Sequence, residues 1–153
     1  ILTIDALEAT ITAEGESEMA WTIGDSGFRM RLSGYVPGII GASIGDVVEP
    51  LLAPTVPSET PLWAIHPGGR SILDKVEQSL GLTEAQLAPS RGVLRDYGNM
   101  SSATVLFILE RLLGAGARAG GGTEASSVGE ALCAMAFGPG LTVEVGRFTR
   151  MRA

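Results

Sequence analysis

The sequence has very few of the residues that build disulfides and metal centres. Its 153 residues include one cysteine, Cys133, and one histidine, His66. A single cysteine excludes an internal disulfide and a cysteine-based zinc cluster, and it favours a reducing cytoplasm as the compartment. We therefore predict a cytoplasmic protein without a metal site.

Positive charge is also scarce. The chain has one lysine, Lys75, and a net charge of −6. Because affinity for nucleic acid depends on clustered Lys and Arg, this balance argues against a nucleic-acid partner. Charged residues make up only 18% of the chain, against roughly 25% in an ordinary soluble domain. We expect the chain to bury part of its outside against another chain or segment.

The sequence lacks a hydrophobic run long enough to cross a membrane. Its longest apolar stretch, residues 103–113, is interrupted by Glu110 and Arg111, whereas a membrane-spanning helix needs about 20 apolar residues. An N-terminal signal pattern is absent as well. The first residue is Ile1, and the opening residues already alternate like a strand, so we expect the chain to begin inside a larger protein.

What the sequence does contain is a succession of strand and helix patterns. Apolar alternation predicts strands at residues 2–12, 28–32, 62–65, 130–137 and 141–149. Helical spacing predicts helices at residues 37–52, 70–80 and 100–113, with Pro37 in a first turn and Gly81 as a C-terminal stop. The third helix is apolar on nearly every side, which indicates a central buried position.

Proline and glycine mark the connections between these elements. Prolines punctuate residues 50–61, and the glycine-rich residues 114–122 predict a flexible loop. A Gly-Pro-Gly sequence at 138–140 predicts the turn of a closing antiparallel hairpin. The element order predicts an α/β layered fold with a mixed five-stranded sheet packed by helices.

Two polar residues stand at positions that suit catalysis. His66 follows the strand at 62–65 and precedes a Pro-Gly-Gly turn, so its imidazole leaves the sheet edge beside a helix N-terminus. Asn99 directly precedes the helix predicted at 100–113. Both side chains can donate hydrogen bonds to one carbonyl oxygen, which is the arrangement that stabilises an enolate or an oxyanion.

Structural interpretations stand beside these functional ones. A lone histidine is often structural, and asparagine is favoured at turns and helix N-termini. Cys133 lies in an apolar run, which predicts an inert core thiol rather than a nucleophile. By composition alone Trp21 and Met30 are core residues, and residues 137–140 are a hairpin turn.

Four strings carry a family resemblance: WAIHPGG at 63–69, ILDKVE at 72–77, YGNMSSA at 97–103 and FGPGLTVE at 137–144. In this order they resemble the C-terminal half of the type III polyketide synthases, the chalcone and stilbene synthase family. The related initiating ketosynthases of fatty acid synthesis carry a His-Gln-Ala-Asn string in place of His-Pro-Gly-Gly. The string MAWTIGDSG at 19–27 is more similar to bacterial members of the family.

The resemblance implies a thiolase-like fold of two similar halves, of which residues 1–153 form the second. It implies a homodimer that pairs with its own N-terminal half, acyl-CoA and malonyl-CoA as substrates, and no cofactor. His66 and Asn99 would be the catalytic residues, stabilising the enolate formed when malonyl-CoA is decarboxylated, while the nucleophilic cysteine lies in the N-terminal half. The resemblance also implies a set of substrate-binding residues: Trp21, Met30, Leu32, Gly68, Ser71, Ser101, Phe137, Gly138 and Pro139.

Two positions depart from the pattern of the plant enzymes. Met30 stands where they carry a gatekeeper phenylalanine, and Gly34 lies near the position of a lysine of the coenzyme A tunnel. Plant substrate preference is therefore not expected. Met30 is flexible enough to yield to a long acyl chain.

Two alternatives stay open at this point. One is a non-catalytic, truncated thiolase-like module, because residues 1–153 do not include the family's nucleophilic cysteine. The other is a ketosynthase similar to 3-oxoacyl-ACP synthase III. An upstream cysteine-bearing segment in the same gene would favour the enzyme over the non-catalytic module.

Overall fold

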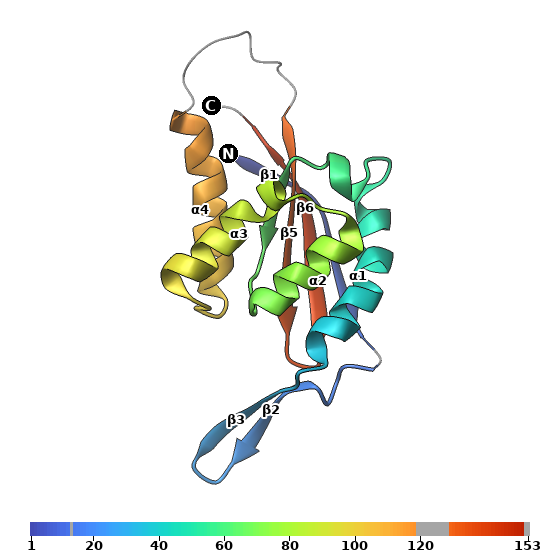
Figure 1. Ribbon diagram of the computed structural model, residues 1–153, viewed down its shortest axis with the longest axis vertical. Coiled ribbons are helices and arrows are strands. Elements are labelled where there is room, and N and C mark those ends of the chain that lie inside the picture. The colour runs from blue at the N-terminus through green and yellow to red at the C-terminus, as the bar shows by residue number, and fades with distance from the viewer. Residues whose placement is uncertain (13, 119–128, 152–153) are drawn as a thin grey trace.

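A computed structural model describes residues 1–12, 14–118 and 129–151 of the chain (Figure 1). The strands are β1 (Leu2–Ile11), β2 (Met19–Gly24), β3 (Gly27–Leu32), β4 (Leu62–Ile65), β5 (Glu130–Gly138) and β6 (Thr142–Arg150). The helices are α1 (Val36–Leu52), α2 (Arg70–Leu80), α3 (Glu84–Tyr97) and α4 (Ala103–Arg118), with a 3-10 turn, η1 (Pro57–Glu59), before β4. The chain is thus an α/β layered fold, as the sequence predicts.

The main sheet has four strands in the order β1-β6-β5-β4. Strand β4 pairs with β5 in parallel, while β5 with β6 and β6 with β1 are antiparallel, so the sheet is mixed. The prediction of five strands in one sheet is wrong. The predicted strand at 28–32 is β3, which pairs with the unpredicted β2 in a separate hairpin that projects beyond the end of the sheet (Figure 1).

Helices α1 and α2 confirm the predicted apolar spacing. The buried residues of α1 recur every four positions, from Val36 to Leu52, and Pro37 lies in its first turn as expected. Helix α2 has the predicted bounds and ends at Gly81, which adopts the left-handed conformation with φ of 62°. Glycine reaches this conformation at little cost, which explains the clean stop.

Helix α3 is not among the predicted helices. Pro89 and Gly92 interrupt its helical pattern, and both are poor helix formers. Its start is nevertheless encoded locally. The Thr83 side chain accepts a hydrogen bond from the Gln86 backbone, and the Gln86 side chain accepts one from the Thr83 backbone, which forms a capping box.

Helix α4 differs from the prediction in both bounds and burial. It begins at Ala103 rather than Met100, and it continues to Arg118, so the first part of the predicted glycine-rich loop is helical. Residues 119–122 of that loop lie outside the described residues. Leu106 is 63% exposed, whereas Ile108 is fully buried. Within this chain α4 is therefore a helix with one buried face, not a helix enclosed on all sides.

The two faces of the sheet carry two separate hydrophobic clusters. On one face, alternate residues of β4 and β5, such as Trp63 and Met135, pack against α1 and α2. On the other face, Ala64 and Leu132 pack against Val93 of α3 and the buried side of α4. This alternation is expected because successive strand residues point to opposite faces.

Part of the second face has no cover among the described residues. Ile4, Leu7 and Ile11 lie there, opposite Phe148, Gly146 and Thr142 of β6, and they are 67%, 66% and 72% exposed. A bulge interrupts the pairing of β1 with β6 between Ile4 and Ala6. Helix α4 covers the β4 side of this face and leaves the β1 side open (Figure 1).

Candidate functional site

His66 is held where β4 leaves the sheet. The three strand residues before it are fully buried, and its backbone N–H donates to the Met135 carbonyl of β5 at 2.8 Å, so it continues the ladder by one residue. Its own carbonyl accepts a hydrogen bond from the Gly68 N–H at 3.1 Å, which closes the turn into α2. The side chain is only 9% exposed. The backbone on both sides therefore fixes the position of the imidazole.

Burial also sets the ionisation state of this imidazole. Desolvation lowers the pKa of His66 below its ordinary value of 6.5, because the charged form loses its hydration. At neutral pH the ring is therefore uncharged, with one nitrogen that donates and one that accepts. A neutral ring in this position can donate a single hydrogen bond to a carbonyl oxygen.

Asn99 lies in the turn between α3 and α4. Its Nδ2 donates to the Gly68 carbonyl at 3.3 Å, and its Oδ1 accepts from the Ser101 backbone N–H at 2.8 Å. The turn interpretation of Asn99 is correct, but the helix it was expected to cap begins further along, at Ala103. Since a carboxamide has two N–H donors and one is used here, the second remains for a ligand.

The structure brings His66 and Asn99 to the same cavities. A cavity of about 740 Å³, here the helix-mouth cavity, lies between the first turns of α1 and α2. A second cavity of about 500 Å³, here the sheet-end cavity, lies between the β2–β3 hairpin and the β5–β6 turn. Five residues line both: Met19, Met30, His66, Asn99 and Phe137. The two cavities therefore meet at the histidine and the asparagine.

The residues predicted to bind substrate all lie on these cavity walls. The sheet-end cavity is lined by Trp21, Met30, Ser101, Phe137, Gly138 and Pro139. The helix-mouth cavity is lined by Met30, Leu32, Gly68, Ser71 and Phe137. Trp21 is 53% exposed and Met30 is 47% exposed, so the interpretation of these two residues as core is wrong within this chain. Their roles as substrate contacts stay predictions.

Sequence reasoning missed several lining residues. Met19 lies on the same hairpin face as Trp21, and the apolar alternation of 19, 21 and 23 is the signal that identifies it. Tyr35 and Lys75 line the helix-mouth cavity, and Glu144 lines the sheet-end cavity. Lys75 and Glu144 stand in two of the strings that carry the resemblance, but those strings do not mark them as lining residues. The packing of α1 against α2 and the register of β6 place these three side chains there.

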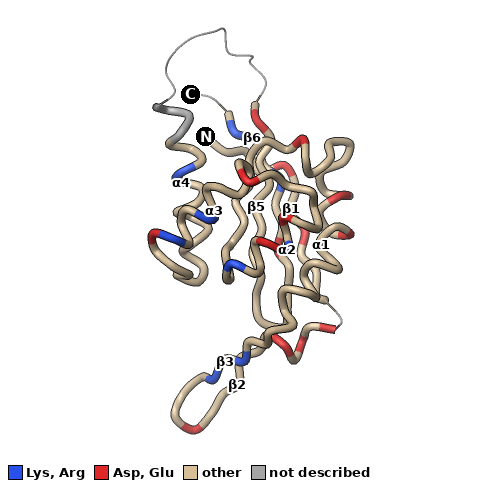
Figure 2. Tube along the Cα trace, in the orientation of Figure 1, with Lys and Arg blue, Asp and Glu red and all other residues tan. Residues whose placement is uncertain are grey.

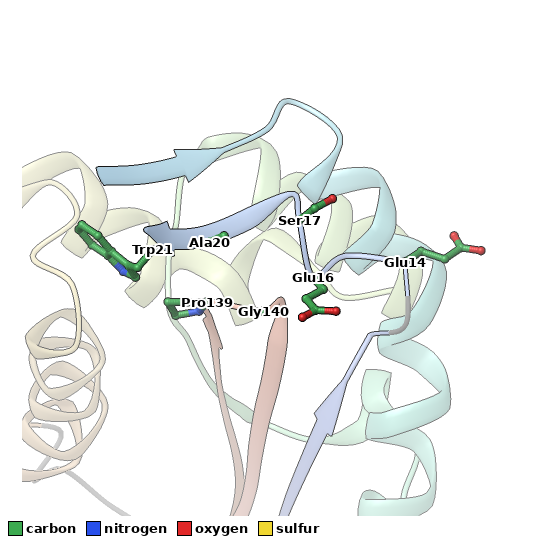
Figure 3. Close-up of a pocket in the computed structure, with 7 residues that line it drawn as sticks. All are labelled: Glu14, Glu16, Ser17, Ala20, Trp21, Pro139 and Gly140. Carbon is green, nitrogen blue, oxygen red and sulfur yellow. The ribbon is translucent and has the colours of Figure 1, made fainter. Parts of the chain in front are cut away.

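A third hollow has two acidic side chains on its wall. It has a volume of about 670 Å³ and is lined by the segment before β2 and by the β5–β6 turn. Figure 3 shows Glu16 near Pro139 and Gly140, with Glu14 at the far end. Neither His66 nor Asn99 lines this hollow, whereas both line the other two cavities. We therefore place the candidate site at His66 and Asn99.

Cys133 is not part of the site. It lies fully buried in β5, and burial raises the pKa of its thiol to about 12. A thiol with this pKa is protonated at neutral pH and is a poor nucleophile. The prediction of an inert core thiol is confirmed.

In the described ranges, no three residues among His, Cys, Asp and Glu gather to hold a metal ion. Nor does any helix in that part of the chain combine the length and the apolar character that a membrane crossing requires.

Comparison with known proteins gives two findings. Residues 4–149 match the family model of the chalcone and stilbene synthases, C-terminal domain. The structure is similar to the crystal structure of PKS-I from the brown alga Ectocarpus siliculosus, with a TM-score of 0.84 and 29% sequence identity. That match covers 98% of this chain and 40% of PKS-I. The chain therefore spans less than half the length of the solved structure.

Proposed function

The chain belongs to the chalcone and stilbene synthase family as its C-terminal, thiolase-like domain, and we propose that it supplies the enolate-stabilising half of a type III polyketide synthase site. The observation that carries this proposal is the meeting of His66 and Asn99 at the junction of two cavities. One donor from each residue, both aimed at one thioester oxygen, is an oxyanion hole.

The reaction proposed is a decarboxylative condensation. In malonyl-CoA the bond between the α-carbon and the carboxylate breaks, CO₂ leaves, and the electron pair moves into the thioester as an enolate. His66 and Asn99 hydrogen-bond to the enolate oxygen, where negative charge develops. The α-carbon then attacks the carbonyl of an acyl thioester, and the thiolate of that thioester departs. The substrates are acyl-CoA and malonyl-CoA, and no cofactor takes part.

The acyl group is proposed to be bound as a thioester to a cysteine outside residues 1–153. Cys133 cannot take this role, because it is buried and its pKa is about 12. In the proposal the neutral His66 ring accepts the thiol proton of that outside cysteine, and the imidazolium so formed stabilises the thiolate, which is the form that accepts the starter acyl group. His66 thus serves both loading and condensation, whereas Asn99 serves condensation alone.

The uncovered apolar surfaces support a proposed pairing with an N-terminal half and a homodimer. The open part of the sheet exposes Ile4, Leu7 and Ile11, and the hairpin exposes Ile23 and Phe28. Exposed apolar surface of this kind marks sites of association. The compartment proposed is the reducing cytoplasm, on the basis of the cysteine content.

Substitution of Asn99 tests the proposal most directly. In the complete gene product, Asn99→Ala should lower the rate of acetyl-CoA release from malonyl-CoA by about 10²- to 10³-fold, as loss of one oxyanion donor does. Loading of a starter acyl group, read by intact mass, should be largely retained. His66→Ala should impair both steps. Thr22→Ala, an exposed hairpin residue outside both cavities, is the control and should change neither.

Three results would replace the proposal. If Asn99→Ala decarboxylates malonyl-CoA at the parent rate, Asn99 is a turn residue only. If the complete protein neither loads an acyl group nor releases acetyl-CoA, the non-catalytic module is the better description. Turnover with malonyl-acyl carrier protein but not with malonyl-CoA would favour the ketosynthase alternative. Mass spectrometry of products from a panel of acyl-CoA starters then identifies the substrate.

A further inference from the structure

The wall of the helix-mouth cavity contains a single lysine, Lys75, which lies one helical turn beyond Ser71 on α2. Ser71 and Lys75 are four residues apart on α2, so they lie on the same face of the helix, about 6 Å apart along its axis. Both line the cavity that His66 and Asn99 also line. Among the described residues that line it, Lys75 is the only one with positive charge.

The acidic neighbours of Lys75 in the sequence are engaged elsewhere. Arg91 of α3 forms ion pairs with Asp74 at 2.8 Å and with Glu77 at 2.7 Å. These two carboxylates therefore face α3. Among the ion pairs of the described residues, none includes Lys75, whose Nζ donates to the Gln78 side chain at 3.3 Å. The ammonium thus keeps two N–H donors for a ligand.

The stem of Lys75 is held by the close approach of α1 to α2. A Cβ built on Gly41 of α1 would lie 3.5 Å from the Lys75 Cβ and 3.6 Å from its Cδ. The Ser79 hydroxyl donates to the Gly41 carbonyl at 2.7 Å and fixes the same contact. These distances are ordinary van der Waals separations, so the aliphatic stem of Lys75 lies against α1 while the residue as a whole remains exposed.

The charge around the cavity explains why one cation matters. The chain has a net charge of −6, and Figure 2 shows acidic positions along α1 and in the segment before β2, and basic positions on β3 and at the start of α2. A polyanionic substrate is repelled by the net charge of the chain unless cations beside the cavity compensate for it. Lys75 supplies that compensation on the wall of the cavity.

We propose that the Lys75 ammonium binds a phosphate group of the coenzyme A portion of the substrate. The inference rests on the proposed function, because it requires a thioester whose carbonyl lies at His66 and Asn99. The coenzyme A arm then passes Ser71 on the exposed face of α2 toward Lys75. An ammonium is a compact point charge and is well suited to a phosphate oxygen.

The test compares two thioesters that differ in the adenosine and diphosphate portion of coenzyme A, which carries all of its phosphate groups. The complete gene product is assayed for decarboxylation of malonyl-CoA and of malonyl-pantetheine, which carries no phosphate. The quantity compared is kcat/KM for malonyl-CoA divided by kcat/KM for malonyl-pantetheine. Lys75→Ala should lower this ratio by about three- to tenfold. The expected loss is larger than that for an exposed ion pair and smaller than that for a buried hydrogen bond to a charged group. Lys75→Arg should restore most of the ratio.

A matched control removes a different positive charge. Arg29 is an exposed residue of β3 that does not line the helix-mouth cavity, and Arg29→Ala should leave the ratio unchanged. The effect of Lys75→Ala should also shrink at high ionic strength, because salt screens an exposed contact.

Three results would overturn the inference. The first is that Lys75→Ala leaves kcat/KM unchanged with both thioesters, and the second is that it lowers kcat/KM equally with both, which would indicate a structural role. In either case, if the parent protein still decarboxylates malonyl-CoA, the proposed function stands without Lys75. The third is a parent protein that acts on neither thioester, which removes the proposed function and this inference together.

Discussion

Burial of single side chains sets which groups of this protein can react. His66 and Cys133 are both buried, but burial acts on them in opposite directions. It lowers the pKa of the imidazole and raises the pKa of the thiol to about 12. In both cases the neutral form is favoured. The result is a histidine that donates as an uncharged ring and a cysteine that does not react.

The pH dependence of stability should report on His66. Unfolded His66 takes up a proton near pH 6.5, whereas the folded form does so only at lower pH. The unfolded state therefore binds more protons below about pH 6.5, and the free energy of unfolding falls as the pH drops through that value. In the His66→Gln variant the free energy of unfolding should fall less between these pH values. Urea unfolding of residues 1–153 at pH 7.5 and 5.5 measures this difference for the parent and the variant.

His66 is the only histidine of the sequence, which makes the assignment unambiguous. The imidazole resonances in an NMR titration should give a pKa below 6.5. A measured pKa at or above 6.5, or the same decline in the His66→Gln chain, would show that the ring is not desolvated as described.

At the scale of elements, the start of α3 connects two parts of the fold. The capping box of Thr83 and Gln86 satisfies backbone groups at the helix N-terminus. The same Gln86 side chain donates from Nε2 to the carbonyls of Thr60 at 2.8 Å and of Ser58 at 3.3 Å. One side chain thus joins α3 to the segment that leads into β4 and His66.

Truncation of the capping box should destabilise the protein measurably. We expect Thr83→Ala to lower the free energy of unfolding by about 1 kcal/mol, as loss of an N-cap does. Gln86→Ala should cost more, about 1 to 2 kcal/mol, because it also removes the bonds to the segment before β4. Thr55→Ala is the matched control, and its effect should stay within about 0.5 kcal/mol. Equal effects of Thr83→Ala and Thr55→Ala in urea unfolding would contradict this role.

The sequence predicts those elements whose apolar pattern survives intact. Helices α1 and α2 have regular buried stripes and clear start or stop residues, so their bounds are close to the predicted ones. Helix α3 contains a proline and a glycine and is held by long-range contacts, and only its capping box marks it. The sequence pattern of the hairpin strands is that of ordinary strands. It therefore does not predict that β2 and β3 form a sheet separate from the main one.

In the candidate site, too, some residues are predictable from the sequence and others are not. His66 and Asn99 are predictable because each sits in a short motif between regular elements. Lys75 and Glu144 are not, since their place on the cavity walls depends on how α1 meets α2 and how β6 is registered against β5. A motif specifies its own turn, whereas a cavity wall is a property of the packing of several elements.

At the scale of the whole molecule, the β2–β3 hairpin has two chemically different faces. One face carries Trp21, Ile23, Phe28, Met30 and Leu32, each between 47% and 81% exposed. Trp21 and Phe28 form an edge-to-face pair with ring centroids 6.2 Å apart. The other face carries Thr22 and the two arginines of β3. An apolar face that is continuous with the cavities is suited to association.

Residues 1–153 alone should therefore self-associate. We expect sedimentation velocity to show species larger than a monomer that increase with concentration. The double substitution Ile23→Ser and Phe28→Ser at the hairpin should weaken this association, since these side chains are 81% and 72% exposed and line neither cavity. A parent chain that sediments as one monomer at all concentrations would contradict the interpretation of these faces as interfaces.

The bulge in β1 has a further consequence for how this sheet ends. Strand β1 is an edge strand, and a flat edge with free backbone groups recruits strands of other chains into fibrils. Asp5 lies at the bulge, where it accepts a hydrogen bond from the Thr149 hydroxyl at 2.7 Å. A bulge bends the strand and a carboxylate is costly to enclose, so both oppose growth along this edge. Asp5 and the bulge thus oppose the addition of a further strand along β1, although the sheet face beside them is apolar.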